Sequence, residues 1–492
     1  MTIVYQSSSS SSMVTVANGD DLVVREAIDI YVSGTGVTLS SGNSRTGLLN
    51  QGDIFGILAV NVNASNTRIV NEGSIHGVTQ DAIDLGGGDG KAVIVNTGTI
   101  TADAHLIDVE EATGTIDLFF NNAGIALADY SVVNAGFVGP NNLGAVYIDN
   151  SGLMRGAVIA MNGDSVSHFR NSGTVETNLI DMRSDLNGLF FNSGTITGLR
   201  SPDAIVSAAL NAGIFGSDNN NFMANSGTIY GVIRGGDGID RYEAFGNGFV
   251  SEGVFGEAGD DTFSGGSQAD LLDGGADNDK LVGRGGDDNL IGGSGLDVIL
   301  GGDGNDSIDA GPDADTAQGN AGDDTILGGT GNDLLLGQDG SDLLDGGSDN
   351  DTIDGGAGDD ILEGGNGNDI LRGRAGEDDL AGGLGRDFLT GGQDADNFVF
   401  RALAETVVGA NRDQILDFEQ GVDLIVVAGL SPGVFEFRGT AGFAPSGNPE
   451  LRLVETATGS TIVQLDADGD GTQDAEIRVA NVTGLTADDF VL

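Results

Sequence analysis

The chain has 492 residues, with 75 acidic against 20 basic side chains and a formal net charge of −55 at pH 7. Such a negative protein repels nucleic acid and anionic membrane surfaces, which argues against both as partners. Cysteine is absent, so there is no disulfide framework, and the 85 glycines favour turns over helices. No apolar run is long enough to predict a transmembrane helix.

The first stretch, MTIVYQSSSSSS, has neither the basic start nor the apolar core of a secretory signal peptide. We expect residues 1–27 to form a flexible leader and an N-terminal cap. Export of this chain would therefore need a signal elsewhere.

Residues 28–234 carry a loose repeat, Asn-x-Gly-x-Ile/Val-x-Gly. It begins at Asn50, Asn71, Asn96, Asn150, Asn171, Asn192 and Asn225, with shorter versions at Asn121, Asn134 and Asn211. The nine steps from Asn50 to Asn225 average about 19 residues. A second apolar segment follows the motif, as in AIDL (82–85), and a third leads into the next Asn, as in AVIVN (92–96).

Three short strands in a coil of this length are typical of a parallel β-helix. Asn-x-Gly predicts a turn in which Asn tolerates left-handed geometry and is able to hydrogen-bond to the Asn one coil away. A β-sandwich also uses short strands, but it would not repeat one motif in one phase. This half resembles the stacked repeats of bacterial surface proteins and adhesins and, more distantly, pectate-lyase-type β-helices.

Polysaccharide lyases and epimerases on β-helices need a base and a charge-neutralising group in one groove. The best local clusters are His105 with Asp103, Asp108, Glu110 and Glu111, and His168 with Arg170, Arg183, Asp181 and Asp185. We interpret both as exposed turn side chains and assign no catalytic residue. HExxH, GxSxG and Tyr-Gly-Phe-Asp-Pro-His motifs are all missing from the sequence.

From Gly256 to Val399 the sequence divides into sixteen nonapeptides without insertion or deletion, and an outlying unit, GGDGIDRYE, precedes them at 235–243. The first place is Gly except at Ala310, and the eighth is a large apolar residue except at Ala317. The sixth place is always Asp: Asp261, Asp270, Asp279, Asp288, Asp297, Asp306, Asp315, Asp324, Asp333, Asp342, Asp351, Asp360, Asp369, Asp378, Asp387 and Asp396.

Each unit predicts a turn followed by a short strand at places seven to nine, whose eighth residue points inward. Glycines at places one, two and four allow left-handed turns. Two units then make one coil, so Asp270 lies against Asp288 and Asp261 against Asp279. Stacked carboxylates repel unless a cation lies between them, and oxygen-only ligands suit Ca²⁺ better than Mg²⁺ or Zn²⁺. The sixteen aspartates are therefore the predicted calcium ligands, with at most about 14 internal ions.

This array resembles the RTX (repeats-in-toxin) family of serralysin-type proteases, pore-forming toxins, alginate epimerases and surface-layer proteins. The resemblance covers residues 235–399 and implies a parallel β-roll that binds Ca²⁺ in its turns and folds after type I secretion. It leaves the activity open, because the family attaches these repeats to many cargoes.

Residues 400–492 predict a small β cap. DQILDFEQGVDLIVV (413–427) resembles the stretch that follows RTX arrays and predicts two strands around Gly421. DADGDGTQDAE (466–476) matches the start of an EF-hand loop but lacks its twelfth-place Glu, so we expect a hairpin turn, with a weak calcium site from Asp466 to Asp474 as the alternative. Residues 481–492 resemble a type I secretion signal, with an ordinary last strand as the alternative.

The sequence thus predicts an all-β protein: a parallel β-helix, a calcium-binding parallel β-roll and a cap. We expect a secreted, non-enzymatic surface or matrix component whose partners are calcium, the type I secretion machinery and either further copies of itself or a cell-surface polysaccharide. The rival hypothesis is a polysaccharide lyase or epimerase. Asp, Arg and His side chains converging in a groove across neighbouring coils would favour that rival.

Overall fold

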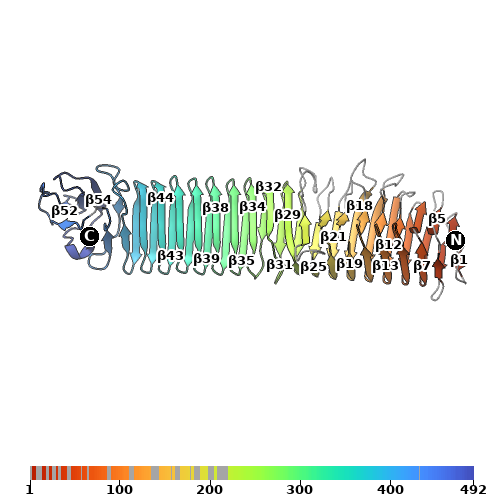
Figure 1. Cartoon of the computed structure of the whole chain (residues 1–492). Helices are drawn as coiled ribbons and strands as arrows, with labels where there is room; N and C mark the ends of the chain where they lie inside the picture. The colour runs from red at the N-terminus through yellow and green to blue at the C-terminus, as the bar shows by residue number, and fades with distance from the viewer. Residues whose placement is uncertain are drawn as a thin grey trace. The chain divides into compact units, whose positions relative to one another are not determined.

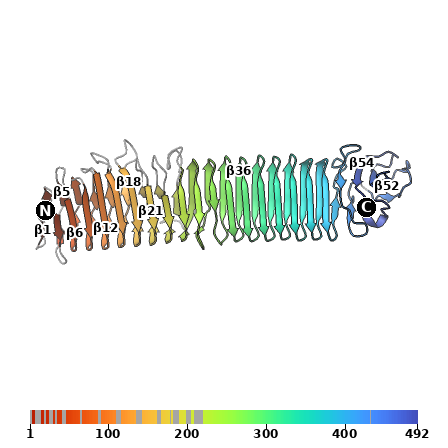
Figure 2. The same ribbon diagram turned by 180° about the vertical axis from the view of Figure 1, so that it is seen from behind.

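The structure is a computed structural model with two compact units, residues 1–266 and 267–492. It describes residues 3–6, 14–17, 21–24, 29–31, 35–40, 46–56, 58–63, 66–85, 90–109, 116–134, 143–156, 158–160, 167–177, 179–181, 189–197, 204–207, 220–430 and 433–492. In each unit, up to the antiparallel strands near the C-terminus, strands follow one another side by side in parallel (Figure 1; Figure 2 gives the view from behind). The predicted all-β solenoid fold is confirmed. The boundaries predicted after residues 27, 234 and 399 stay predictions.

The first unit is built from coils that contribute one short strand to each of three parallel sheets. The first sheet contains β1 (Ile3–Gln6), β3 (Asp21–Val24), β6 (Thr46–Asn50), β9 (Thr67–Asn71), β12 (Gly90–Asn96), β15 (Ile116–Asn122), β18 (Leu143–Asn150), β21 (Ser167–Asn171), β24 (Leu189–Asn192), β27 (Phe222–Asn225), β30 (Arg241–Ala244) and β33 (Thr262–Ser264). The second contains β4 (Asp29–Tyr31), β7 (Asp53–Gly56), β10 (Ser74–Gly77), β13 (Thr99–Ala102), β16 (Ile125–Ala128), β19 (Leu153–Arg155), β22 (Thr174–Glu176), β25 (Thr195–Thr197), β28 (Thr228–Ile229) and β31 (Phe249–Val250).

The third face of this unit is formed by two successive runs of strands. They are β2 (Val14–Ala17), β5 (Thr35–Ser40), β8 (Leu58–Asn63), β11 (Ile83–Asp84), β14 (Ile107–Asp108) and β17 (Val133–Asn134), and then β20 (Val158–Ala160), β23 (Leu179–Asp181), β26 (Ala204–Ser207), β29 (Gly231–Asp237) and β32 (Val254–Ala258). The predicted three strands per coil are therefore present.

A buried asparagine closes each first-sheet strand from β6 to β27. The amide of each one donates to the side-chain oxygen of the next, as in Asn96 to Asn122 (2.7 Å) and Asn122 to Asn150 (2.8 Å). The ladder comprises Asn50, Asn71, Asn96, Asn122, Asn150, Asn171, Asn192 and Asn225. The predicted hydrogen bonding from coil to coil is confirmed.

Two positions of the asparagine prediction are wrong, and a third is not tested. The ladder uses Asn122 instead of Asn121, and Asn134 lies on β17 in the third sheet. Asn211 lies outside the described residues. The ladder steps therefore span 21 to 33 residues, longer than the predicted average, because the connections between strands vary in length while the stacked strands do not. No ladder asparagine has a positive φ, because each ends an extended strand.

The motif glycine is required by close stacking of the coils. A Cβ on Gly124 would lie 2.7 Å from the carbonyl carbon of Thr97 in the coil before it. Only glycine leaves room for successive turns to approach this closely.

The second unit is a flattened coil with two parallel sheets, and successive nonapeptides alternate between them. One sheet contains β35 (Lys280–Gly285), β37 (Val298–Asp303), β39 (Thr316–Ala321), β41 (Leu334–Asp339), β43 (Thr352–Ala357), β45 (Ile370–Ala375) and β47 (Phe388–Gln393). The other contains β34 (Leu271–Ala276), β36 (Asn289–Ser294), β38 (Ser307–Pro312), β40 (Thr325–Thr330), β42 (Leu343–Ser348), β44 (Ile361–Gly367), β46 (Asp379–Gly385) and β48 (Asn397–Val399).

The eighth-place side chains form the core of this roll, as predicted. Every one of them from Leu272 to Phe398 is at most 1% exposed, including the small Ala317. Ala317 is smaller than the apolar residues at the same place of the other units, so the core is thinnest there. Replacing a large buried apolar side chain by Ala typically costs about 2–5 kcal/mol.

The strands are longer than predicted, because they run from the seventh place into the third place of the next unit. Their pairing skips the first-place glycines: Val282 pairs with Leu300 and Arg284 with Gly302. Left-handed φ values occur at the second and fourth places, as at Gly302 and Gly304, but not at the first. Glycine at place one therefore serves another purpose.

The cap begins with β49 (Gln414–Ile415) and β50 (Leu424–Val426), which stack on β47 and β48 on either side of a Gly421 turn. This confirms the predicted two strands. An antiparallel sheet of β52 (Glu450–Glu455), β53 (Thr461–Asp466) and β54 (Ala475–Val479) follows, beside β51 (Glu436–Phe437). The chain ends in β55 (Phe490–Val491), which pairs with β50.

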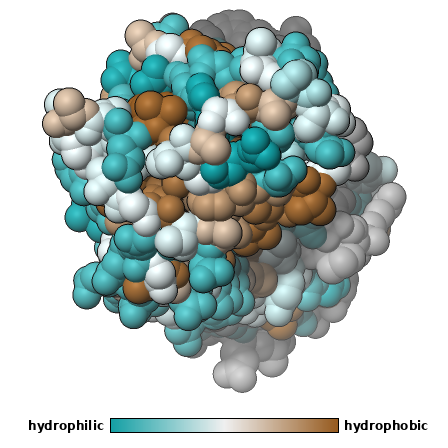
Figure 3. Space-filling model, turned by 90° about the vertical axis from the view of Figure 1, so that its left-hand side faces the viewer, coloured by the Kyte–Doolittle hydropathy of each residue, from teal (hydrophilic) through white to brown (hydrophobic). Residues whose placement is uncertain are grey.

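The cap presents a mixed surface at the end of the second unit. Figure 3 faces this end and shows apolar residues gathered near its middle among hydrophilic ones. Exposed apolar side chains of the cap include Val422, Val434 and Val454.

We predict that Asn122→Ala lowers the stability of the first unit by about 1–3 kcal/mol, because it leaves the buried amides of Asn96 and Asn150 without a partner on one side. Urea unfolding in calcium measures this change. Asn121→Ala is the matched control, because Asn121 is the adjacent, exposed residue. Equal effects of the two substitutions would refute a structural role for the ladder.

Candidate calcium sites and an outer groove

The sixth-place aspartates line the inside of the turns. All sixteen are buried, with exposures from 0% to 5%. Carboxylates are rarely buried without a positive partner, because removal of a charge from water is costly. Their burial thus requires a specific arrangement of the surrounding groups.

One carboxylate oxygen of each aspartate from Asp288 to Asp396 joins neighbouring coils. The backbone N–H of Asp270 donates to Oδ1 of Asp288 at 2.8 Å, and that of Asp288 donates to Oδ1 of Asp306 at 2.8 Å. The same bond recurs every 18 residues up to Asp396. The predicted pairing of alternate units is therefore confirmed over this range, while the pair Asp261–Asp279 stays a prediction.

The other carboxylate oxygen, Oδ2, is buried without a hydrogen-bond partner in a long series of these residues. In the described chain the series comprises Asp240, Asp288, Asp297, Asp306, Asp315, Asp324, Asp333, Asp342, Asp351, Asp360, Asp369, Asp378, Asp387 and Asp396. Desolvation, together with the repulsion of neighbouring carboxylates, raises the pKa of Asp288 and Asp360 to about 7 and that of Asp387 to about 8. Backbone N–H donation opposes the shift only in part.

Except in the unit of Asp315, which begins with Ala310, the Oδ2 atom of each aspartate in this series faces the first-place glycine of its own unit. A Cβ built on Gly283 would overlap Oδ2 of Asp288 and lie 2.6 Å from the carbonyl oxygen of Gly301. Gly337 has the same relation to Asp342 and to the carbonyl oxygen of Gly355, which is 2.5 Å away. A carboxylate oxygen and a carbonyl oxygen thus converge on a space that only glycine leaves open.

This donor set fits calcium. Ca²⁺ prefers carboxylate and carbonyl oxygens, accepts irregular geometry and would supply the positive charge that the buried Oδ2 atoms lack. The residues that would hold it are the sixth-place aspartates and the first-place glycine carbonyls.

Ala310 is the exception in the first place, where a Cβ built on the glycine of other units would overlap an aspartate oxygen. Its own unit contains Asp315, whose Oδ2 is also buried without a partner, and the small core residue Ala317. Both exceptions of the array thus fall in one nonapeptide, and we expect the methyl group of Ala310 to hinder calcium binding there.

The aspartate series extends beyond the array at both ends. Asp240, from the outlying unit, donates its N–H to Oδ1 of Asp261 at 2.7 Å and has a desolvated carboxyl whose pKa rises to about 7. In the cap, Asp413 accepts from the N–H of Asp387 (2.9 Å) and Asp423 from that of Asp396 (3.2 Å). The predicted calcium ligands did not include these three aspartates, although they end or lie within the segments GGDGID (235–240) and DQILDFEQGVD (413–423), which stand out in the sequence.

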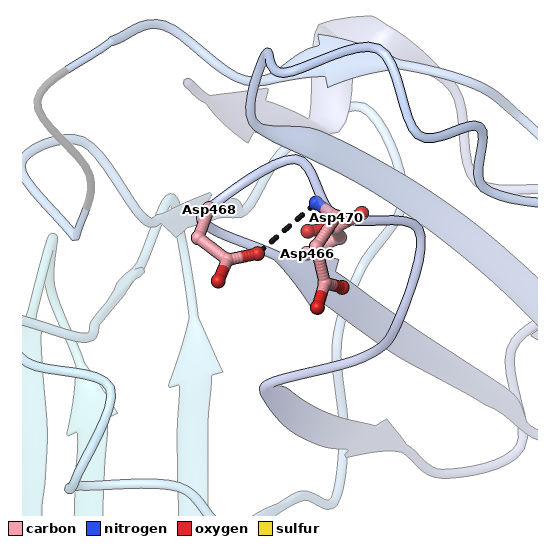
Figure 4. A group of neighbouring side chains, drawn as sticks. All are labelled: Asp466, Asp468 and Asp470. Carbon is pink, nitrogen blue, oxygen red and sulfur yellow. Dashed lines mark hydrogen bonds between the residues drawn. The ribbon is translucent and has the colours of Figure 1, made fainter.

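Three acidic residues of the cap also lie close together, in the loop between β53 and β54. Figure 4 shows Asp466, Asp468 and Asp470 with the bond from the Asp470 N–H to Asp468 (3.0 Å). The Asp466 carboxylate accepts from the N–H groups of Gly469 (2.7 Å) and Gly471 (2.8 Å). The expected hairpin turn is confirmed, and these hydrogen bonds hold its shape.

The first unit has a groove of about 530 Å³ on the outer face of its first sheet. Tyr147, Asp149, His168 and Arg170 lie in it, with Asn121 beside them. Burial lowers the pKa of His168, which favours its neutral form. Sequence reasoning took His168 and Arg170 for exposed turn residues; they lie on strand β21, and Tyr147 and Asp149 lie opposite them on β18.

The other sequence clusters are not assembled in this groove. The side chain of Asp103 accepts from the N–H of Thr79, and the His105 ring lies beside Tyr130. Asp108 is on β14 in the third sheet. Glu110, Glu111, Arg183, Asp185 and the side chain of Asp181 lie outside the described residues.

The fold and the acidic turn sites together define a calcium-binding parallel β-roll. The sequence model of the RTX calcium-binding nonapeptide repeat, which covers four copies, matches residues 254–281, 282–317, 309–344, 318–353, 336–371, 354–389 and 372–400. This part of the chain is an array of RTX calcium-binding repeats, a module that is itself non-catalytic.

Two solved structures are similar to part of the chain. They are the AlgE6R3 and AlgE6R2 subunits of the Azotobacter vinelandii mannuronan C5-epimerase, with 30% and 26% sequence identity and TM-scores of 0.24 and 0.22. The matches cover 30% and 29% of this chain and 78% and 90% of those subunits. A search of curated proteins finds no match. In the described chain, no helix is long and apolar enough to cross a membrane.

We predict that the metal-free roll loses stability as pH rises from about 5 to 7.5. Desolvation raises the pKa of carboxyls such as Asp351 and Asp324 to about 7, so the folded state holds protons that the unfolded chain has already released. Urea midpoints in chelator measure this trend. With saturating calcium we expect the opposite slope, because the metal binds the deprotonated form. A metal-free midpoint that rises with pH would contradict the burial of these groups.

We predict that Ala310→Gly adds one bound calcium ion per chain, because it removes the one first-place methyl group of the array and restores the glycine found in the other units. The reciprocal substitution Gly337→Ala removes one ion, since its methyl group enters the space between Asp342 and the Gly355 carbonyl. Equilibrium dialysis with metal analysis counts the ions. Identical counts in the parent chain and both variants would show that this space does not hold the metal.

Proposed function

We propose that the protein is a secreted structural component of the bacterial surface or extracellular matrix, which folds on binding calcium and assembles into polymers. The observation that carries this proposal is the long row of buried aspartate Oδ2 atoms without hydrogen-bond partners, placed within RTX repeats. Such a row is unfavourable without cations and becomes a rigid stack with them.

Calcium would also set where the protein folds. Extracellular calcium modules bind at about 10⁻⁴–10⁻³ M, so they fill only where the ion is plentiful. RTX repeat proteins are typically secreted. The last residues form a short 3₁₀ turn, η1 (Ala487–Asp489), and the strand β55, so the segment that resembles an export signal is also a last strand of the cap. Its role in type I export remains part of the proposal.

Assembly is supported by apolar side chains on the outer faces of the roll. Val298 and Leu334 are 41% and 37% exposed on one sheet, and Leu343 and Ile361 are 38% and 43% exposed and adjacent on the other. Flat parallel sheets with apolar rows are surfaces along which copies can associate.

One observation supports the alternative function, a polysaccharide lyase or epimerase. Tyr147, Asp149, His168 and Arg170 converge in one groove across neighbouring coils, which is the arrangement that the alternative requires. Incubation with acidic polysaccharides, followed by analysis of chain length and uronate composition, tests for turnover.

The proposal predicts that the roll of the purified protein in chelator at pH 7.5 is unfolded and the protein unassembled, and that millimolar calcium at the same pH gives ordered filaments or sheets. Electron microscopy and light scattering measure this directly. Asp342→Asn is expected to shift assembly to higher calcium, and Asp339→Asn, which changes an exposed acid in the same turn region, is the matched control. Folded monomers in calcium that stay monomeric at high concentration would rule out the polymer.

A further inference from the structure

Aromatic side chains form a row on the outer face of the first sheet in the first unit. Parallel register places Phe119 opposite Tyr147 and Tyr147 opposite His168. The Phe119 and Tyr147 rings are stacked with centroids 4.6 Å apart, and the His168 ring meets Tyr147 edge-on at 4.7 Å. The row therefore presents one ring for each coil, at about the spacing of parallel strands.

The groove beside this row crosses five strands, from β12 to β24. Val93 and Val95 on β12 line one end and Phe191 on β24 lines the other. Because the groove runs along the stacking direction of the coils, it suits an extended ligand better than a compact one. The distance from coil to coil is close to the length of one sugar ring in an extended chain.

Two charged side chains and a tyrosine hydroxyl group lie beside the apolar row. Asp149 and Arg170 occupy opposite register positions and are exposed. In the part of the chain that the structure describes, neither side chain makes a hydrogen bond or an ion pair, and neither does the Tyr147 hydroxyl. These groups are available to hydroxyl and carboxylate groups of a ligand.

Charged side chains of both signs lie on this face. Lys91 lies over the Phe119 ring, 3.9 Å from its centroid, and opposite the exposed Asp117, while Arg68 is exposed on β9 beside Val93. Inside the groove, the Arg170 guanidinium, whose two parallel N–H groups match a carboxylate, lies opposite Asp149. A ligand that carries a carboxylate for Arg170 and hydroxyl groups for Asp149 is the chemistry that complements this face.

We propose that this groove binds a segment of an acidic polysaccharide, a chain of uronate residues. Arg170 pairs with a uronate carboxylate, Asp149 and Tyr147 bond to ring hydroxyls, and the apolar row contacts the C–H faces of the sugars. This inference goes beyond the structural role proposed above, because the site lies outside the repeats and uses none of their aspartates.

Isothermal titration calorimetry with short oligogalacturonates, at one fixed calcium concentration, tests the proposal on the full chain. The parent protein is expected to bind the oligouronate and to bind neutral cello-oligosaccharides of equal length at least tenfold more weakly. Arg170→Ala is expected to weaken oligouronate binding about tenfold or more, since a charge-assisted hydrogen bond is lost. Tyr147→Phe keeps the ring stack and is expected to weaken binding by a smaller factor.

Arg155→Ala is the matched control, because Arg155 is an exposed arginine on β19 in the second sheet and pairs with Glu176. We expect its affinity to stay within twofold of the parent. Circular dichroism checks that each variant is folded. No binding by the parent chain at millimolar oligouronate, or an equal loss in Arg155→Ala and Arg170→Ala, would overturn the proposal. Binding accompanied by cleavage or epimerisation supports the groove and favours the enzymatic alternative.

Discussion

The roll depends on carboxylates that are stacked away from water. Each sixth-place aspartate from Asp288 to Asp396 uses one oxygen to accept a backbone N–H from the coil before it, which fixes the register between coils. The second oxygen then points beside the first-place glycine, where no side chain balances its charge. Hydrogen bonding thus sets the geometry, while the electrostatic cost of that geometry makes the fold dependent on a cation.

Much of this unit could be predicted from the sequence because its repeat has no insertions. A fixed period of nine forces Leu290 and Ile308 into one column, and it forces Asp288 and Asp306 into another. The role of the first glycine was harder to predict. Its φ is not left-handed, and the reason for its presence is a contact with an aspartate five residues later, which depends on three-dimensional packing.

The first unit was predictable in type, and its phase at Asn122 was also in the sequence, because Asn122 and not Asn121 stands two residues before Gly124. A shift of one residue matters because side chains alternate across a strand, so it exchanges inside and outside. The groove was missed for a different reason: Tyr147, His168 and Phe191 are far apart in the sequence and meet only through parallel register. At the end of the array, Asp413 and Asp423 lie outside the period of nine, so the period could not reveal them.

Because successive nonapeptides alternate between two sheets, the number of nonapeptides before a strand decides which sheet that strand joins. Cap strand β49 stacks on β47 and β50 on β48, so each cap strand belongs to one sheet only. Loss or gain of 18 residues changes the roll by a whole coil and returns every later strand to its own sheet. Loss of a single nonapeptide would send all later strands to the opposite sheet and bring the wrong strand to the cap. Such a roll can therefore gain or lose nonapeptides only in pairs, which limits the lengths that duplication or deletion of its repeats can produce.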